Sequence, residues 1–389
     1  MKIVIATDSF KGSLTANEAV AAIARGVARA IPAAELVCVP LGDGGEGTVD
    51  ALVAAVPGSR RLTRLVIGPF GALVDATYGL LGLRGLVAVV EMAAASGITL
   101  VPREKLNPMR ATTYGTGELL GYALSRPVLE EMIIGIGGSA TNDGGAGALQ
   151  ALGAEFIDAN GDPITDPMTP ELLGSVVGVT WHDHSLKVDD VRITVACDVT
   201  NPLLGPTGAS AVFGPQKGAT PEMVSELDSI LTNFAPNLEF LARQRGGPPD
   251  APPIAHRPGS GAAGGLGAAL MALFPAAEFK SGIDVVLDAV GFDSLLSDAD
   301  LVITGEGKLD PQTLSGKAID GVLRRAKAAS VPVIAFAGAV DADAARALEP
   351  LGLESAYAIL PRAASVADAM ARAGELLEQL AAEVIAGRV

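Results

Sequence analysis

IIGIGGSATNDGGAGALQALG, residues 133–153, is the most informative stretch of this sequence. An apolar run at residues 132–136 ends in a loop of small and polar residues, and an Ala/Leu segment with helical spacing follows. This order predicts a strand, a Gly-rich loop and a helix. Glycines let backbone N–H groups approach an anion closely, and the first turn of a helix carries partial positive charge. The stretch therefore predicts a phosphate or carboxylate site.

Polar side chains in the same loop strengthen this hypothesis. Ser139, Thr141 and Asn142 offer donors, and Asp143 offers a carboxylate that could reach a metal ion. The alternative is a tight strand-to-helix turn closed by an Asn or Asp cap. Several polar residues converge here although a cap needs only one, which favours the functional interpretation.

Composition narrows the class of protein. With 389 residues the chain is long enough for two domains, and its 49% apolar and 19% charged residues predict a globular fold. The net charge of −16 argues against a nucleic-acid partner, because phosphate binding needs a basic face. An anionic substrate stays possible if basic residues gather locally in a cleft.

The sequence has the features of a soluble cytoplasmic protein. Cys38 and Cys197 lie in apolar runs that look like buried strands, with no CxxC or Cys/His metal spacing. The N-terminal apolar run is too short for a signal peptide. Residues 258–277 are uncharged, but their glycines and Pro275 favour a loop and a packed helix over a membrane span. We therefore expect no membrane partner.

Hydrophobic periodicity predicts an α/β fold with two regular ends. At the N-terminal end, strands are expected at residues 2–7 and 35–40, each followed by a helix, and Thr15 and Glu18 have capping-box spacing. Residues 60–91 predict short strands with glycine breaks. At the C-terminal end, strands are expected at residues 301–304, 333–337 and 357–360, with a helix at 315–329 and a long terminal helix.

The alternation of strands and helices predicts two α/β domains. We expect residues 1–80 and 290–389 to form one doubly wound domain, with residues 81–289 inserted into it. Residues 246–259, which are rich in Pro and Gly, are expected to form a surface linker.

Polar residues follow the first predicted strand, at the position where ligands gather in doubly wound sheets. Asp8, Ser9, Lys11 and Ser13 lie there, and Lys11 is a flexible point charge suited to an anionic group. A helix-start loop with a surface lysine is the alternative. After the second strand, GDGGEGT places Asp43 and Glu46 among glycines at a predicted helix start.

Helix capping would explain one of the two carboxylates in GDGGEGT. The pair could instead bind a substrate hydroxyl or a magnesium ion.

In the middle of the chain, ACDVTNPLLG puts Asp198 and Asn201 directly after a strand, and FGPQKG brings Gln216 and Lys217 before a helix. Asp198 is the candidate for taking a proton from a substrate hydroxyl, with an Asx-turn as the alternative.

PGSGAAGGLG, residues 258–267, contains a GxGxxG match at residues 259–264. A dinucleotide fingerprint needs a strong preceding strand and a ribose-binding acid about twenty residues later. The preceding PPIAHR is a poor strand, so the dehydrogenase interpretation is weak. A Gly-rich loop that holds nucleotide phosphates, or that lets a helix and a loop pack closely, accounts for it better.

ITGEGKLDPQTLSGKA, residues 303–318, is the last polar cluster. It supplies Glu306, Lys308, Asp310, Gln312, Thr313, Ser315 and Lys317 between a strand and a helix. Acids here could hold Mg²⁺ through oxygen ligands, and the lysines could neutralise phosphates.

Several catalytic motifs are absent from the sequence. There is no Walker loop, no GxSxG elbow and no HExxH. The histidines, His182, His184 and His256, are expected to be solvent-exposed rather than metal-bound. Phosphoryl transfer fits what remains, because it needs positioning, cations and one base rather than a covalent nucleophile.

Taken together, these motifs resemble the type-1 family of bacterial glycerate kinases, which are unrelated to P-loop kinases. The matching stretches are DSFKGS (residues 8–13), DGGEGT (43–48), EMAAASG (91–97), TTYGTGE (112–118), IGGSATNDGG (136–145), CDVTNPLLG (197–205), FGPQKG (213–218), PGSGAAGGLG (258–267) and GEGKLDPQTLSGKA (305–318). They span nearly the whole chain in order, which makes the resemblance specific although each motif alone is weak.

The resemblance implies ATP-dependent phosphorylation of (R)-glycerate to 2-phosphoglycerate, with Mg²⁺, in glyoxylate, glycolate or glucarate catabolism. It also implies two α/β domains: one is Rossmann-like with a doubly wound, mostly parallel sheet, and the second is inserted into it. The active site is expected in the cleft between them. The expected ligands are glycerate and ATP, and the expected assembly is a monomer or a homodimer.

The resemblance also suggests a role for each candidate residue. Asp198 is the expected base, and Lys11 and Asp43 are the other catalytic residues. The substrate-binding residues are Asp8, Ser9, Asn201, Gln216 and Lys217. The nucleotide-binding residues are Gly137, Gly138, Ser139, Asn142, Gly259, Ser260, Gly261 and Lys317, most of them in two loops that would cradle phosphates. Glu306 and Asp310 are the expected Mg²⁺ ligands.

Three other functions stay open. A glycerate 3-kinase would give 3-phosphoglycerate. A NAD-dependent hydroxy-acid dehydrogenase would use the GxGxxG match as its fingerprint. A non-catalytic sugar-acid sensor would bind glycerate without turnover, although the acidic and lysine groups argue against it.

Overall fold

The computed structural model describes residues 1–181, 190–314 and 318–388. Over this part of the chain the fold divides into two compact α/β units. Unit 1 comprises Met1–Asp43, Asp50–Pro57 and Ser281–Val389, and unit 2 comprises Gly44–Val49 and Gly58–Lys280.

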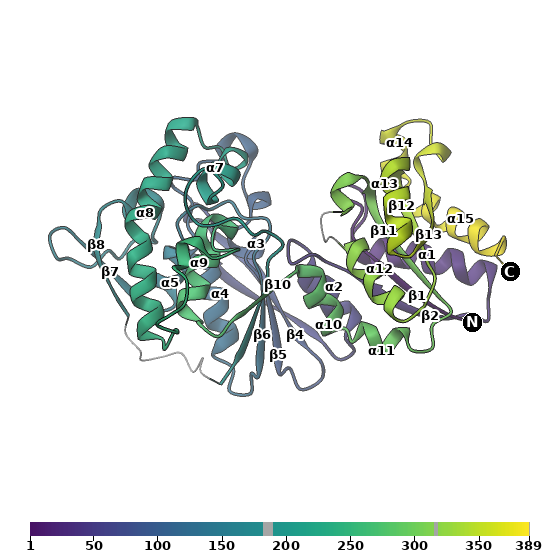
Figure 1. Cartoon of the computed structure of the whole chain (residues 1–389), viewed down its shortest axis with the longest axis horizontal. Helices are drawn as coiled ribbons and strands as arrows, with labels where there is room; N and C mark the ends of the chain where they lie inside the picture. Colours follow the sequence, from purple (N-terminus) through teal and green to yellow (C-terminus); the bar gives the residue numbers. More distant parts are fainter. Residues whose placement is uncertain (182–189, 315–317, 389) are drawn as a thin grey trace. The chain divides into compact units, whose positions relative to one another are not determined.

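Unit 1 is built on a parallel sheet (Figure 1), which has five strands in the described residues, in the order β13-β12-β11-β1-β2. The strands are β1 (Lys2–Thr7), β2 (Glu35–Pro40), β11 (Leu301–Leu309), β12 (Val333–Val340) and β13 (Leu353–Ala358). Its helices are α1 (Ala16–Ala30), α2 (Thr48–Ala55), α10 (Gly282–Ala289), α11 (Phe292–Leu296), α12 (Ala318–Ala328), α13 (Ala342–Leu348), α14 (Val366–Ala371) and α15 (Ala373–Ala386). The chain leaves β1 toward β2 and later returns on its other side as β11, so the strand order reverses beside β1.

One part of the core of unit 1 lies between the sheet and the pair α1 and α15. Ile3 and Ile5 of β1 are fully buried and share this core with Ile23 of α1 and Leu377 of α15. The two helices approach so closely that a Cβ at Gly26 would lie 2.3 Å from a carbonyl oxygen of α15. The predicted capping box is confirmed, since the side chains of Thr15 and Glu18 each accept from the other's backbone N–H at the start of α1.

Unit 2 contains a mixed sheet, which has six strands in the described part of the chain, in the order β10-β9-β6-β5-β4-β3. The strands are β3 (Arg60–Ile67), β4 (Leu73–Leu81), β5 (Val87–Glu91), β6 (Glu131–Gly135), β9 (Arg192–Ala196) and β10 (Glu278–Lys280); β7 (Ala154–Asp158) and β8 (Val176–Trp181) form a separate antiparallel pair. β3, β4 and β5 pair antiparallel, whereas β5, β6, β9 and β10 run parallel. The carboxyl ends of β5, β6 and β9 therefore lie at one edge.

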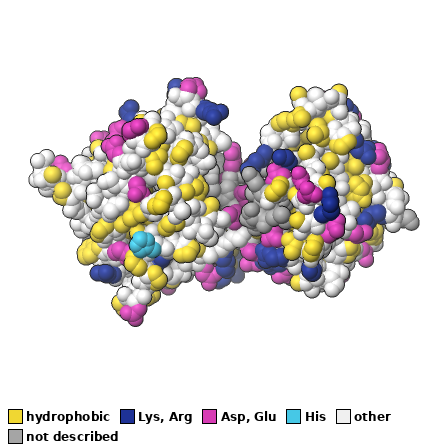
Figure 2. Space-filling model, turned by 45° about the horizontal axis from the view of Figure 1, so that its top comes forward, with side chains coloured by type: hydrophobic (Ala, Val, Ile, Leu, Met, Phe, Trp, Pro, Cys, Tyr) yellow, Lys and Arg dark blue, Asp and Glu magenta, His cyan; other side chains and the backbone are white. Residues whose placement is uncertain are grey.

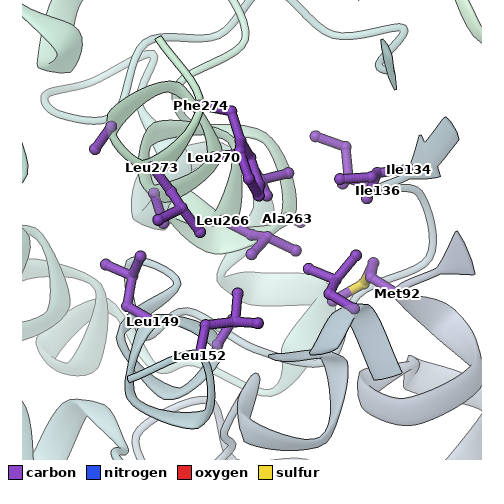
Figure 3. Packing of buried hydrophobic residues seen from close by; sticks show 14 of the residues in the cluster. Met92, Ile134, Ile136, Leu149, Leu152, Ala263, Leu266, Leu270, Leu273 and Phe274 are labelled. Atoms are coloured by element: carbon purple, nitrogen blue, oxygen red, sulfur yellow. The ribbon is translucent and has the colours of Figure 1, made fainter. Parts of the chain in front are cut away.

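The helices of unit 2 pack on this sheet and on one another. They are α3 (Ala93–Ser96), α4 (Tyr114–Leu124), α5 (Ala146–Ala151), α6 (Pro170–Leu173), α7 (Ala209–Phe213), α8 (Pro221–Gln244) and α9 (Leu266–Leu273). Figure 3 shows the core of the unit from close by, where Leu266 and Leu270 of α9 gather with Ile134 of β6 and Leu149 of α5. All of these side chains are buried.

Short 3₁₀ turns connect many of these elements. They are Ile98–Leu100, Arg103–Lys105, Pro215–Lys217, Ile254–His256, Ala262–Gly265, Pro311–Leu314, Glu349–Leu351 and Leu360–Arg362. Among the described helices, none is both long and apolar enough to cross a membrane.

The α/β class with mostly parallel strands is confirmed, but the division of the chain differs from the expected one. The first segment of unit 1 ends before β3 rather than at residue 80, because β3 and β4 find their hydrogen-bonding partners in the sheet of unit 2. The last segment begins at Ser281 rather than at residue 290, because α10 packs against α12. Periodicity shows that a strand is present but not which sheet completes its hydrogen bonds.

Three local expectations were wrong. The strand expected at residues 357–360 lies earlier, as β13, whereas the expected long terminal helix is present as α15. Cys38 is exposed in β2, whereas a buried position was expected. The segment expected to be a surface linker includes Ile254, which is 1% exposed because it packs into the core of unit 2.

Candidate functional site

In unit 1, candidate residues gather at the carboxyl ends of β1, β2 and β11. Asp8 follows β1, its N–H donates to the Gly305 carbonyl of β11 at 3.0 Å, and the Ser9 N–H donates to its Oδ1 at 2.6 Å. Asp43 follows β2. Its negative charge raises the pKa of Asp8, whereas the positive charge of Lys11 lowers the pKa of Asp8. This cluster lies where the strand order reverses, the position at which doubly wound sheets bind ligands.

The electrostatics of this cluster favour proton exchange near neutral pH. Burial, followed by the negative charge of Asp43, raises the pKa of Asp8 from 3.8 to about 6, against smaller opposing effects of the Ser9 N–H and of Lys11. A carboxyl group with such a pKa can take or give a proton under ordinary conditions.

The end of β11 carries the predicted metal ligands. Glu306 accepts a hydrogen bond from the Thr313 hydroxyl, which itself accepts from the Asp310 N–H at 3.0 Å. The Asp310 carboxylate lies 3.2 Å from the Lys308 ammonium group. Within the residues described, no three His, Cys, Asp or Glu side chains cluster as a metal site. Glu306 and Asp310 still fit Mg²⁺ bound in the manner of kinases, by one or two carboxylates together with substrate phosphates.

In unit 2, Glu91 lies at the edge of the sheet where the parallel strands end, and it binds backbone N–H groups there. It ends β5, is 6% exposed, and accepts from the N–H groups of Gly47 (3.2 Å) and Val49. Gly44 in the same segment accepts from the Gly137 N–H at 3.2 Å, and a Cβ at Gly135 would lie 2.4 Å from the Gly44 carbonyl oxygen. Glu91 thus holds the DGGEGT segment against the end of β6.

Replacing Glu91 with Gln is expected to loosen this segment. A Gln side chain offers one oxygen and one N–H₂ group, so one of the two backbone N–H groups loses its acceptor. Hydrogen bonds to charged groups contribute about 1.5–3 kcal/mol, and we expect a loss of stability of that size. Thermal unfolding measures it, with Glu104→Gln, an exposed position in unit 2, as the matched control. Equal melting temperatures for the two variants would contradict the role of Glu91.

The Gly-rich loop after β6 is the predicted anion site, and the structure gives its acid another function. Asp143 is fully buried, and its carboxylate accepts from the Thr113 N–H (2.8 Å), the Thr113 hydroxyl (2.7 Å), Gly145 N–H (3.1 Å) and Gly147 N–H (3.2 Å). These donors use the oxygens that a metal ion would need, so Asp143 shapes the loop instead. Gly138 is exposed and Gly137 half-buried, whereas Ser139 and Asn142 are buried.

The second Gly-rich loop, residues 258–267, packs against the first. A Cβ at Gly264 would lie 2.0 Å from the Thr141 carbonyl oxygen, and the Gly264 carbonyl accepts from the Gly144 N–H at 2.9 Å. The N–H groups of Ser260 and Gly261 donate to carbonyls of the chain at 3.1 Å and 3.0 Å, and both residues are buried. The structure therefore supports close packing, the alternative weighed for this loop, over a phosphate cradle.

The remaining candidates of unit 2 differ in exposure. Asp198 is exposed directly after β9, at the same edge as Glu91. Asn201 donates through Nδ2 to the Thr207 carbonyl at 2.8 Å, and Gln216 is exposed. Lys217 is 1% exposed, and burial lowers its pKa from 10.5 to about 7 although the negative charge of Asp143 acts in the opposite direction.

The structure thus brings the candidates together in two groups, one within each unit. Asp8, Asp43 and Lys11 form the group of unit 1, and the loops around Asp198 and the two Gly-rich loops form that of unit 2. Lys317, Ser315, His182 and His184 lie outside the described residues. The sequence did not predict the roles of Glu91, Thr113 and Ser210, because their hydrogen-bonding partners are distant in sequence. The one feature that could have pointed to Glu91 is its position at the end of an apolar run.

Comparison with known proteins agrees with the motifs. The model of the glycerate kinase family matches residues 3–388. A glycerate kinase of Bacillus subtilis (strain 168) is 47% identical over 99% of this chain and 97% of its own length. A glycerate 2-kinase of Escherichia coli (strain K12) is 46% identical over 92% of this chain and 91% of its own.

A solved structure described as a glycerate kinase 2 from Salmonella typhimurium LT2 is similar over the whole fold. The two superpose with a TM-score of 0.85 at 44% identity, covering 100% of this chain and 98% of the other. Sequence, family model and fold agree over nearly the full length, and the chain belongs to the glycerate kinase family.

Proposed function

We propose that this protein phosphorylates (R)-glycerate with ATP and releases 2-phosphoglycerate. Membership of the family over residues 3–388 carries the proposal. The choice of the 2-position rests on the similarity to the Escherichia coli glycerate 2-kinase. Glyoxylate, glycolate or glucarate breakdown would supply such a substrate.

The group of unit 1 has the chemistry that phosphoryl transfer requires. The reaction needs cations that offset phosphate charge and one group that accepts the hydroxyl proton. Lys11 supplies a cation on the loop after β1, and the Asp8–Asp43 pair supplies carboxylates at the reversal of the strand order. Mg²⁺, when bound, would neutralise charge on the phosphates, and Glu306 and Asp310 are the residues that would hold it.

Two carboxylates compete for the role of proton acceptor. Asp198 stands exposed at the end of β9, which gives it access to a substrate, and it is the base that the family resemblance suggests. Asp8 has a pKa raised to about 6, which suits proton transfer near neutral pH. We propose Asp198 as the base and Asp8 as the alternative, and the variants described in the Discussion separate the two.

The product of the reaction tests the proposal directly. The protein is incubated with Mg·ATP and D-glycerate, and the phosphorus NMR spectrum is followed. We expect a new monoester signal that matches 2-phosphoglycerate. A 3-phosphoglycerate signal would keep the kinase but place the transfer on the other hydroxyl. The absence of any monoester, despite glycerate binding by calorimetry, would support a different sugar acid or the sensor function.

A NAD-dependent dehydrogenase is less compatible with the fold. The GxGxxG match begins at Gly259, but the residues before it form the 3₁₀ turn Ile254–His256 rather than a strand. The dinucleotide fingerprint depends on that strand. Absence of the reduced-cofactor absorbance on incubation with NAD and glycerate is the expected result.

We further propose a cytoplasmic enzyme whose partners are glycerate and ATP, acting as a monomer or homodimer. Both cysteines are free thiols, which agrees with a reducing compartment. The net charge of −16 argues against a nucleic-acid partner, and on the face shown in Figure 2 basic and acidic side chains are interspersed.

A further inference from the structure

Lys217 was expected to bind substrate, but it is buried inside unit 2. It ends the 3₁₀ turn Pro215–Lys217 between α7 and α8, and its side chain is 1% exposed. Its Nζ donates to the Thr141 carbonyl at 2.6 Å. A lysine in this position reaches the Gly-rich loop of residues 136–145 from inside the protein rather than from a solvent-exposed ligand site.

Asp143, the acid of this loop, is fully buried and accepts hydrogen bonds from four donors. Burial raises the pKa of Asp143, but hydrogen bonds from Thr113, Gly145 and Gly147 favour the carboxylate. The Thr113 hydroxyl accepts from the Ala148 N–H at 2.9 Å, so its proton points to Asp143 at 2.7 Å. This bond and those from the backbone N–H groups partly offset the effect of burial on the pKa of Asp143.

A buried carboxylate needs a compensating positive charge. Removing one partner from a buried ion pair is strongly destabilising, because the remaining charge stays buried without compensation. Lys217 lies inside the same unit, and the negative charge of Asp143 favours its protonated form. The two residues are 74 positions apart in the sequence, so this pair forms only when unit 2 is folded.

The Thr141 carbonyl is the point at which Lys217 meets the two Gly-rich loops. It accepts from Lys217 Nζ and faces Gly264, where a side chain would collide with it at 2.0 Å. The next residue, Asn142, donates through Nδ2 to the Ser210 hydroxyl of α7 at 2.9 Å. Among the described residues, Thr141 Oγ1 and Asn142 Oδ1 are buried without a hydrogen-bond partner. The loop is therefore incompletely held by its own hydrogen bonds, and the lysine supplies the missing restraint.

We propose that Lys217 is a positioning residue: its buried ammonium group, hydrogen-bonded to the Thr141 carbonyl, holds the loop of residues 136–145 in its ligand-binding conformation without touching the ligand. This inference rests on the proposed kinase function, in which the loop contacts an anionic ligand. A loop displaced by about 1 Å can lower catalysis by about 100-fold.

A double-mutant cycle separates positioning from substrate binding. Lys217→Met, Asp143→Asn and the double variant are compared at pH 6.5, where Lys217 is mostly protonated. We expect each single variant to lower kcat about 100-fold, to lower the Tm by about 10 °C and to speed amide exchange in the loop. The double variant should regain at least tenfold in kcat and part of the Tm, because no buried charge is left unpaired.

The matched control is Lys105→Met, the same substitution at an exposed position of unit 2, for which we expect unchanged kcat, Tm and exchange. A lysine that binds substrate would behave differently. Lys217→Met would then raise KM or lower kcat with normal Tm and loop exchange, and Asp143→Asn would add an independent loss. That pattern would overturn the proposal.

Two readouts do not depend on kinase activity. The coupling of Lys217→Met and Asp143→Asn in Tm is measurable even if no product forms, so failure of the proposed function is distinguishable from failure of this inference.

If Lys217→Met does not fold, the wild-type protein supplies the second measurement. Loop protection, compared with that of α9 in the same protein, should fall from pH 6.5 to pH 8.5 as Lys217 loses its proton. Constant relative protection would contradict the proposal.

Discussion

Replacing Asp8 with Asn is expected to make the protein more stable at neutral pH. The pKa of Asp8 is raised from 3.8 to about 6, so keeping this carboxylate ionised in the folded state costs free energy above pH 6. A shift of this size corresponds to about 2–3 kcal/mol. Asn removes the buried charge while keeping the shape of the side chain.

The sign of the pH dependence follows from the direction of the shift. A group whose pKa is raised on folding contributes stability below its unfolded pKa, and that contribution is lost as the pH rises through the folded pKa. The stability of the wild type should therefore fall between about pH 4 and pH 6 relative to that of Asp8→Asn, and the gap should stay constant above this range.

Urea denaturation of both proteins across this pH range measures the effect. Asp250→Asn, an exposed position, removes the same formal charge and serves as the control. Parallel stability profiles for wild type and Asp8→Asn would show that Asp8 ionises freely in the folded protein. Asp43→Asn should lower the pKa of Asp8, because it removes a neighbouring negative charge, and should narrow the pH range over which stability falls.

Asp198→Asn is expected to reduce kcat by 100-fold or more while leaving stability nearly unchanged. Loss of a general base has an effect of this size. Asp198 is exposed, so removing its charge does not relieve a buried group. The measurement is kcat under saturating ATP and glycerate, together with a melting curve, and Asp166→Asn is the exposed control in the same unit.

The two variants together assign the base. If Asp198 is the base, kcat of the wild type falls at low pH as Asp198 takes up a proton. This acid limb of the pH–rate profile is then lost in Asp198→Asn and kept in Asp8→Asn. A near-normal kcat for Asp198→Asn, with loss of an acid limb near pH 6 in Asp8→Asn, would assign the role to Asp8 instead.

Features with local causes were predictable from the sequence. The strand, loop and helix around residues 131–151 follow from hydrophobic period and glycine content, and the capping box at Thr15 follows from two side chains three residues apart. The polar residues after β1 and β2 were located correctly, because parallel strands place their carboxyl ends at one edge.

Features that depend on distant partners were not predictable. Asp143 looked available to a metal ion, but Thr113, 30 residues earlier, donates two hydrogen bonds to its Oδ2. Ser260 and Gly261 looked like a phosphate cradle, but their N–H groups donate to carbonyls of the chain. No short window of sequence contains these partners.

The sequence by itself therefore determined the α/β class, the family and most strand and helix positions, since periodicity, caps and motifs act over a few residues. The tertiary structure alone decided that β3 and β4 complete the sheet of unit 2 and that Lys217 is buried and bonded to the Thr141 carbonyl. Burial and charge pairing are properties of the folded chain, because they depend on which distant segments exclude water from a side chain.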